Sequence, residues 1–564
     1  MRMPARFIFS VCGGLIIISS VAGFALATQG GSSSAGVKLR PFPSALSPNL
    51  PYDVDAALIG RMMETVHPRD GGQYSPEEAV RVTQAQREFD ILSWQAFLAL
   101  NWPQKAYNRP APTIIDPQGE PLWSYWVPME KIFLPDGAKP DYPWNPAKAE
   151  AADPKDGPAL TMAKAAWRQE ASSDDNFQAF SGPLVDQNGK WVRYEAMVDP
   201  EEFEYIYRNT LYNLDGQIAF SERDIDRNGV DMPVNDATHR HGAIEIKLAW
   251  KELGDHDDKS RFYVKAVRVP IPGPASNGSP GFRTINAGLV GMHIAMHTKS
   301  SPEWIWSTFE QIDNVRQNPL EHGMSHANFM NPKLSASPVN ILPPKNGDCA
   351  GGANCQTWNE ALTTTPVQVA RVDVPNQPGL NPLDGALADE VKALNTEVQV
   401  ILRGNNSVFQ YYELIGTQWP VHKNAPAFAG GEGSAPESIT NKTPGDVLPV
   451  FLVNTTMETY FQKGSQAAGC LEQDNRLTDN CKTDSTPVVG TESCVGCHYS
   501  AGICIGYKRD VAGKPVLVNG AKVPVYGENG HFGRSGHGNF SWMLQIETSK
   551  QSMGVTPAMK KDNP

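Results

Sequence analysis

The sequence predicts an α+β fold, a large mixed body with an antiparallel sheet and peripheral helices. Three observations predict it: capped helical segments, a middle third with strand-like alternation, and a composition that supports a core. The 564 residues are 40% hydrophobic and 20% charged, so the chain can bury a substantial core. It is too long for one ordinary domain, and two or three structural regions are expected.

Two helix starts carry capping signals. Residues 75–102 are the clearest helix, because Ser75 can cap the first turn and Glu78 stands at the capping-box position. Aromatic and aliphatic side chains then thicken one face of this helix, which favours core packing over a binding site. A second helix is expected to start at Asp199, with Glu202 reaching back to the cap.

The middle of the chain changes to a period of two. Ile and Leu alternate with Glu and Lys in residues 243–250, β-branched residues follow in 261–271, and 284–298 form a long apolar run. Strands at this spacing indicate an antiparallel sheet. Helical spacing returns in residues 382–404, where Gly404 is placed to end the helix.

The amino-terminal segment has the order of a secretory signal. Arg2 and Arg6 precede an uncharged apolar run, and small residues lead up to Ala27. We expect a signal peptide over residues 1–27 with cleavage after Ala27. An uncleaved membrane anchor is the alternative, because an apolar run of about 20 residues is long enough to span a bilayer.

The remaining boundaries follow changes in composition. We predict a flexible linker at 28–50, an N-terminal α+β region at 51–331, a loop-rich connector at 332–378 and a C-terminal region at 379–564. The formal net charge is −12, and loss of the two signal arginines takes it to −14. This balance argues against a general binder of nucleic acid or anionic membranes.

The residues ESCVGCHYSAG contain the strongest chemical signal. Cys494, Cys497 and His498 form C-x-x-C-H, in which two thiols can attach a porphyrin and the imidazole can ligate its iron. A structural zinc site needs four ligands, and no second C-x-x-C is present in the sequence. A disulfide is the other alternative. Covalent haem c is the favoured interpretation, and the export signal agrees with it, so a periplasmic location is expected.

The other cysteines of the exported chain suggest disulfides. Cys349 with Cys355 and Cys470 with Cys481 read as two locally closed bridges in an oxidising compartment. Cys504 is left over, either as a buried thiol near the haem or because one pairing is wrong.

The sixth iron ligand decides between electron transfer and catalysis. Met543 is the natural downstream candidate. His293, on one strand face with His297, is the alternative as a distal ligand or proton donor, although a satisfied interior histidine competes with that interpretation. Four other Met and His residues, whose side chains can also ligate iron, are weaker candidates: Met457, His531, His537 and Met553.

A cation site is a further possibility in the sequence. Asp224, Asp226 and Asn228, with Gly229 at the turn, match the first half of a calcium loop. The twelfth position is Asn235 rather than glutamate, so an Asx-rich turn is the competing interpretation. Four further polar residues have two interpretations: they line a pocket, or they belong to an ordinary sheet face and helix surface. They are Glu245, Lys247, Glu310 and Asn314.

Four stretches carry a family resemblance. LSWQAFLALNWP, GLVGMHIAMHTKSSPEWIWSTFEQIDN, VNTTMETYFQ and SCVGCHYSAG together resemble large proteobacterial periplasmic proteins of the cytochrome c family with a single haem motif near the carboxyl terminus. The resemblance implies haem binding and electron transfer, carried onto Cys494, Cys497 and His498. It also implies that the hairpin region with His531 and His537 is an insertion.

Together these observations predict a periplasmic c-type haem protein in electron transfer, with one covalent haem and a redox partner protein. The C-terminal region is not expected to be a compact small-cytochrome fold, because a hairpin replaces the helices that usually follow the motif. Whether it is an oxidoreductase with a small-molecule substrate is left open. Two alternatives stand beside it: a haem enzyme of peroxidase or oxidase type with an open iron position, and a binding module with a structural or sensory haem.

Overall fold

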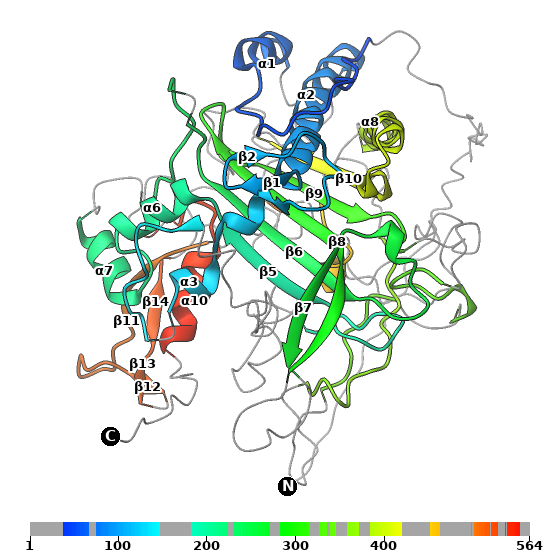
Figure 1. The fold of residues 1–564 in the computed structure, drawn as a ribbon. Coiled ribbons are helices and arrows are strands. Elements are labelled where there is room, and N and C mark those ends of the chain that lie inside the picture. Colours follow the sequence, from blue (N-terminus) through cyan, green and yellow to red (C-terminus); the bar gives the residue numbers. More distant parts are fainter. Residues whose placement is uncertain are drawn as a thin grey trace, which may run out of the picture. The chain divides into compact units, whose positions relative to one another are not determined.

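A computed structural model of the protein describes residues 38–66, 75–134, 136–146, 182–223, 229–238, 240–270, 282–315, 326–334, 339–345, 358–371, 384–419, 452–462, 494, 498, 501–518, 520–527, 536 and 538–552. Within these residues the fold is α+β, with a large antiparallel sheet, which confirms the predicted class (Figure 1).

The central sheet has seven antiparallel strands in the order β10-β9-β8-β6-β5-β4, with β7 also paired to β8. Their bounds are β4 Val127–Pro128, β5 Arg193–Val198, β6 Ile244–Glu252, β7 Val264–Pro270, β8 Phe282–Thr298, β9 Ser301–Gln311 and β10 Tyr412–Gln418. The alternating segments of the sequence are therefore strands, as predicted. Alternation matters here because it gives the sheet one apolar face and one mixed face.

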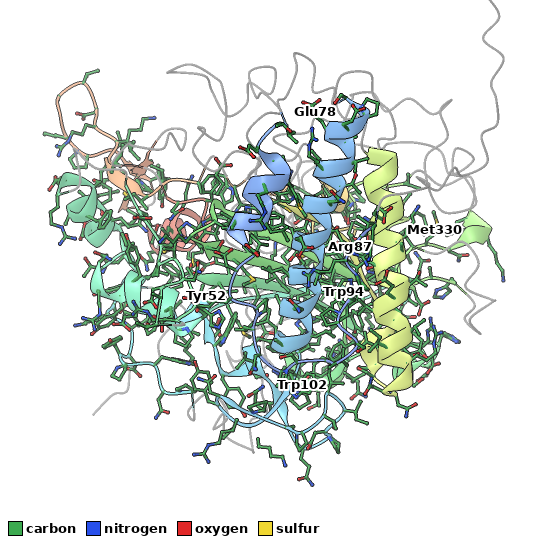
Figure 2. All side chains as sticks on the ribbon, turned by 90° about the horizontal axis from the view of Figure 1, so that it is seen from above. Tyr52, Glu78, Arg87, Trp94, Trp102 and Met330 are labelled. Carbon is green, nitrogen blue, oxygen red and sulfur yellow. The ribbon has the colours of Figure 1, made fainter. Side chains whose placement is uncertain are left out.

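Helices α2 (Pro76–Leu100) and α8 (Asp384–Gly404) cover the apolar face of the sheet (Figures 1 and 2). The capping box predicted at the start of α2 is present, with both of its hydrogen bonds. The Trp94 indole N–H donates to Asn395 Oδ1 of α8 at 2.9 Å. Burial of the aromatic face of α2, rather than ligand binding, therefore explains its composition.

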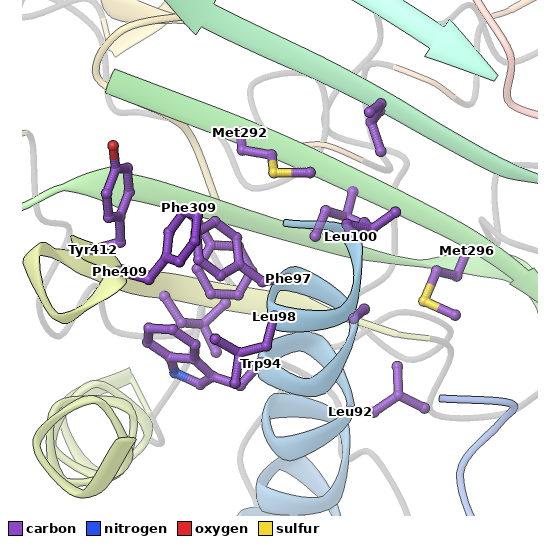
Figure 3. Packing of buried hydrophobic residues seen from close by; sticks show 14 of the residues in the cluster. Leu92, Trp94, Phe97, Leu98, Leu100, Met292, Met296, Phe309, Phe409 and Tyr412 are labelled. Atoms are coloured by element: carbon purple, nitrogen blue, oxygen red, sulfur yellow. The ribbon is translucent and has the colours of Figure 1, made fainter. Parts of the chain in front are cut away.

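An aromatic cluster forms the centre of this core (Figure 3). Phe97 of α2 stacks on Phe309 of β9 with ring centroids 4.3 Å apart, and Trp94 meets Phe309 edge to face at 5.0 Å. Phe409, in the 3₁₀ turn before β10, and Tyr412, the first residue of β10, close the cluster. Since β10 and α8 come after the predicted connector, both halves of the chain contribute to one core.

A second layer lies on the other face. It contains α6 (Pro200–Arg208), α7 (Leu214–Arg223), α10 (Met543–Ser552), β11 (Cys504–Tyr507) and β14 (Pro524–Tyr526). Strand β11 packs against α7, and α10 contacts both α7 and β14. The elements after His498 thus pack against helices that are nearly 300 residues earlier in the chain.

The start of α6 differs from its prediction in one respect. Asp199 caps the helix by accepting the Glu202 N–H at 3.0 Å, as expected. The Glu202 side chain does not reach back to the cap, and neither of its oxygens accepts a hydrogen bond within the described chain. The prediction of a full capping box was wrong, because burial turns Glu202 inward.

The smaller elements complete the architecture. They are α1 Ala56–Met63, β1 Pro103–Ala106, β2 Arg109–Pro110, β3 Glu120–Pro121, α3 Met129–Ile132, β12 Leu517–Val518 and β13 Ala521–Lys522, and the 3₁₀ turns Leu122–Tyr125, Lys259–Arg261, Pro332–Leu334, Val408–Tyr411 and Thr459–Gln462. The predicted hairpin after the motif is the β12–β13 pair. No helix in the described ranges has the length and apolarity needed to cross a bilayer.

Candidate functional site

The mixed face of the sheet is organised in rows across its strands. One row joins Lys247 of β6 to His293 of β8 and Thr308 of β9. The next row joins Glu245 to Ala295 and Trp306 on the same strands. Residues opposite one another in neighbouring strands share a face, so these polar side chains lie together opposite α2.

A segment distant in sequence, residues 452–460, lies on this face. The Asn454 side-chain amide donates to Thr308 Oγ1 at 2.8 Å and to the Phe309 carbonyl at 3.0 Å. Tyr194 of β5 donates its hydroxyl to the Thr456 carbonyl at 2.7 Å. These bonds hold the segment against the strands, which places Glu458 beside His293.

The described residues of the haem motif lie on the same layer. Cys494 and His498 both have helical backbone conformation. Cys494 is a thiol whose sulfur lies 3.5 Å from the Leu452 carbonyl oxygen. The His498 ring packs against Trp306, with ring centroids 4.3 Å apart.

The electrostatic environment of His498 favours the neutral imidazole. Burial lowers its pKa to about 4, and His293 and Lys247 add to the lowering, while the Phe540 carbonyl acts in the opposite direction. At neutral pH the ring is therefore uncharged. A neutral imidazole is the form that ligates a metal.

One hydrogen bond fixes which ring nitrogen is available. His498 Nδ1 lies 2.6 Å from the Phe540 carbonyl oxygen, so Nδ1 carries the proton and donates it. Metal-ligating histidines almost always donate their second N–H in this way, because the bond sets both tautomer and ring orientation. Nε2 is left as the ligating atom. His498 and Cys494 therefore fit a haem c held at this face.

A second histidine of the predicted set lies close by. His293 Nε2 is 2.9 Å from Glu458 Oε1. Burial alone raises the pKa of Glu458, but His293, Lys247 and the Asn454 N–H outweigh burial, so the net pKa lies below its ordinary value. The carboxylate is thus ionised at neutral pH, and it holds the His293 ring by one nitrogen.

The other predicted ligands have packing roles in the structure. His297 is buried, stacks on Trp304 at 5.0 Å and contacts the Pro233 carbonyl, as the interior-histidine interpretation expects. Met457 lies fully buried in an apolar cluster. Met543 is the first residue of α10 and packs in the apolar cluster that Cys494 contacts. Its role as an iron ligand stays a prediction.

The predicted polar set separates into two environments. Glu310 is buried and accepts the Thr455 N–H at 2.7 Å, and Asn314 is buried and donates to the Val290 carbonyl at 2.8 Å. These two residues anchor loops to the sheet. Glu245 instead lies beside Glu202 of α6.

Two buried carboxyl groups, Glu202 of α6 and Glu245 of β6, lie against each other. Burial raises the pKa of both, that of Glu245 to about 7, and the partner carboxyl raises that of Glu202 further. Ser541 lowers the pKa of Glu245, and it directly follows Phe540, the acceptor of the His498 proton. The pair therefore holds a proton at pH values where an exposed glutamate has lost it.

Several predicted residues lie outside the described ranges. They are Cys497, Cys349, Cys355, Cys470, Cys481, His531, His537, Met553, Asp224, Asp226 and Asn228. Cys504 is described, and it is a buried free thiol. Among the described side chains, no three of His, Cys, Asp or Glu converge as metal ligands.

Comparison with protein families, with curated proteins and with solved structures finds no match to this chain. The site therefore has to be interpreted from its own geometry.

Sequence reasoning did not find the residues that complete the site. Trp306, Phe540 and Glu458 contact the predicted histidines, yet none was predicted as a site residue, although Trp306 and Glu458 lie within stretches that carry the family resemblance. The W-I-W spacing at 304–306 does place two indoles on one strand face. Nothing local in the sequence indicates that this face meets His498.

Proposed function

We propose that this protein is an exported, periplasmic haem c protein that transfers single electrons, with its haem attached through Cys494 and Cys497 and ligated by His498. The observation that carries the proposal is the 2.6 Å hydrogen bond from His498 Nδ1 to the Phe540 carbonyl. It orients a neutral imidazole with Nε2 available, which is what a proximal ligand requires.

A bound haem c would supply a reversible one-electron centre. The chain's own contribution is orientation and exclusion of water. Trp306 packs against the His498 ring, and the apolar cluster that contains Trp306, Phe540 and Met543 shields the ring's surroundings. A low-dielectric wall of this kind tunes a redox potential through solvent exposure.

The pair of His293 and Glu458 favours a second candidate function, a haem-dependent oxidoreductase acting on a small molecule. His293 lies close enough to influence the pKa of His498, and Glu458 holds its Nε2. A histidine backed by a carboxylate is suited to move a proton to or from a substrate. In this case the iron has an open position, rather than a second protein ligand.

Production of the exported protein in a host with the cytochrome c maturation machinery tests the proposal. We expect one porphyrin mass on the peptide containing Cys494 and a pyridine haemochrome spectrum of the c type. The C494S variant should show the spectrum of a porphyrin with one vinyl group intact. C504S is the matched control, because Cys504 is a buried thiol outside the motif.

A second test addresses the axial ligand. H498A should lose the native ferric and ferrous spectra, and added imidazole should restore them, whereas H256A, at an exposed histidine, should change neither. A wild-type protein without porphyrin refutes the proposal. Ready binding of cyanide or azide by a high-spin ferric protein favours the oxidoreductase, and a six-coordinate, unreactive iron favours the carrier.

A further inference from the structure

Residues 504–527, which we name the basic arm, start six residues after His498. Strands β11 and β14 pair along its base, and the β12–β13 hairpin lies between them. Two bonds to α7 fix the base: the Cys504 N–H donates to Gln217 Oε1 at 2.7 Å, and the Tyr507 hydroxyl donates to Asp215 Oδ1 at 2.9 Å.

The turn of the basic arm is ordered by its own side chains. Asp510 accepts the N–H groups of Ala512 and Lys514 at 2.9 and 2.8 Å. Arg509 donates to the Gly513 carbonyl at 2.8 Å. The arm therefore presents a preformed surface, which lowers the entropic cost of binding a partner.

That surface is unusually apolar. Five of the thirteen exposed large hydrophobic residues of the described chain lie within these 24 residues: Ile505, Val511, Leu517, Val518 and Val525. Single exposed apolar residues are normal, but such a concentration on ordered β-structure marks an interaction site.

The charge of the basic arm is opposite to that of the rest of the protein. The arm has four basic residues and one acidic residue, a net charge of +3, so the rest of the chain has −15. The basic residues are all exposed, and within the described chain none forms an ion pair: Lys508, Arg509, Lys514 and Lys522. An acidic partner is repelled elsewhere and attracted here, which orients its approach.

Other partners fit less well. A bilayer-docking hairpin usually has exposed aromatic residues at its tip, whereas Tyr507 and Tyr526 are partly buried at the base and the arm has no tryptophan. Exposed apolar side chains together with exposed cations on one ordered arm instead match a protein interface.

We propose that the basic arm is the docking site for an acidic electron-carrier protein and brings it to the haem bound at Cys494 and His498. This inference rests on the proposed function, and it names the partner's chemistry. With a haem held by Cys494 and His498, one electron would pass between the carrier's metal centre and the iron, so that one would be oxidised as the other is reduced, with no bond formed or broken. The carboxylates of the carrier meet the four cations, and an apolar patch meets the exposed valines and leucine.

The experiment measures reduction of the ferric holoprotein by a reduced plant-type [2Fe–2S] ferredoxin, an acidic carrier, in stopped flow. The double variant K508Q and K514Q removes two charges from the arm. We expect its second-order rate constant at low ionic strength to fall about tenfold, because steering of this kind raises association rates by 10-fold or more. The matched control, K105Q with K392Q, removes two exposed lysines elsewhere and should change the rate less than twofold.

The wild-type rate should also fall steeply with salt, and the arm variant should lose most of that dependence. Equal rates for the arm variant and the control, or a wild-type rate insensitive to salt, would overturn the inference. So would arm-dependent sedimentation with phosphatidylglycerol vesicles, or an arm-dependent dimer, in the absence of ferredoxin binding.

Binding of the same ferredoxin, measured by biolayer interferometry, separates this inference from the proposed function. The binding signal does not need haem. If the protein contains no porphyrin but K508Q/K514Q still binds ferredoxin more weakly than wild type, the docking role of the arm is supported and the haem proposal is refuted. If the porphyrin content is normal and the arm variant binds ferredoxin as wild type does, only the docking role of the arm is refuted.

Discussion

The carboxyl pair of Glu202 and Glu245 makes the stability of this protein depend on pH in an unusual direction. Burial raises the pKa of Glu245 from 4.5 to about 7 and also raises that of Glu202. Between those two values the folded protein holds a proton that the unfolded chain releases. Stability is therefore greatest below the unfolded value and falls as pH rises toward the folded value.

The variant E245Q tests this coupling. One pKa unit corresponds to 1.36 kcal/mol, so the shift of Glu245 is equivalent to about 3 kcal/mol, an upper limit because the two carboxyls interact. Glutamine does not titrate, and its amide can donate to Glu202. Relative to wild type, we expect E245Q to gain about 1 to 3 kcal/mol in free energy of unfolding between pH 5 and pH 8.

Urea unfolding at pH 5, 6, 7 and 8 measures the effect. The control is E204Q, on the same helix, where loss of the exposed ion pair with Arg208 should leave the pH dependence of stability close to that of wild type. Asp90 and Asp186 also have raised pKa values, but they are present in all three proteins, so the difference isolates Glu245. Parallel stability curves for wild type and E245Q would refute the shared proton.

Three further variants test the packing. F309A removes a ring that is fully buried against α2 and should lower the free energy of unfolding by about 3 to 5 kcal/mol, which chemical denaturation measures. S75A removes one bond of the capping box with Glu78 and should cost about 1 kcal/mol; a loss above 2 kcal/mol would contradict the capping account. K251M leaves Asp257 buried without its cation and should cost about 3 to 5 kcal/mol, and adding D257N should recover part of that loss.

Local sequence determined the secondary structure wherever a short-range rule applied. The helix at 76–100 could be predicted from its cap, and the strand at 244–252 from alternation, because both rules depend on neighbours within a few residues. The rule failed at Glu202. Glu202 has the spacing from Asp199 that a capping box requires, but its side chain turns inward and meets Glu245 of β6.

Some residues of the candidate haem site could likewise be predicted from local sequence, and others could not. Cys494, Cys497 and His498 come from one contiguous motif, so the sequence alone was enough to propose them as haem attachment and ligand residues. His293 was only one of several candidates by pattern. The structure places it near His498 because β8 and the segment at 452–460 share one face of the sheet.

What the sequence decided by itself was therefore the fold class and the main helices and strands, and it also supplied the C-x-x-C-H motif on which the haem proposal rests. What only the tertiary structure decided was the set of partners around His498: Trp306 from β9 and the Phe540 carbonyl from the segment before α10. The physical reason is distance along the chain. Contacts between residues 40 to almost 200 positions apart depend on how strands register and layers pack, and no local pattern encodes that.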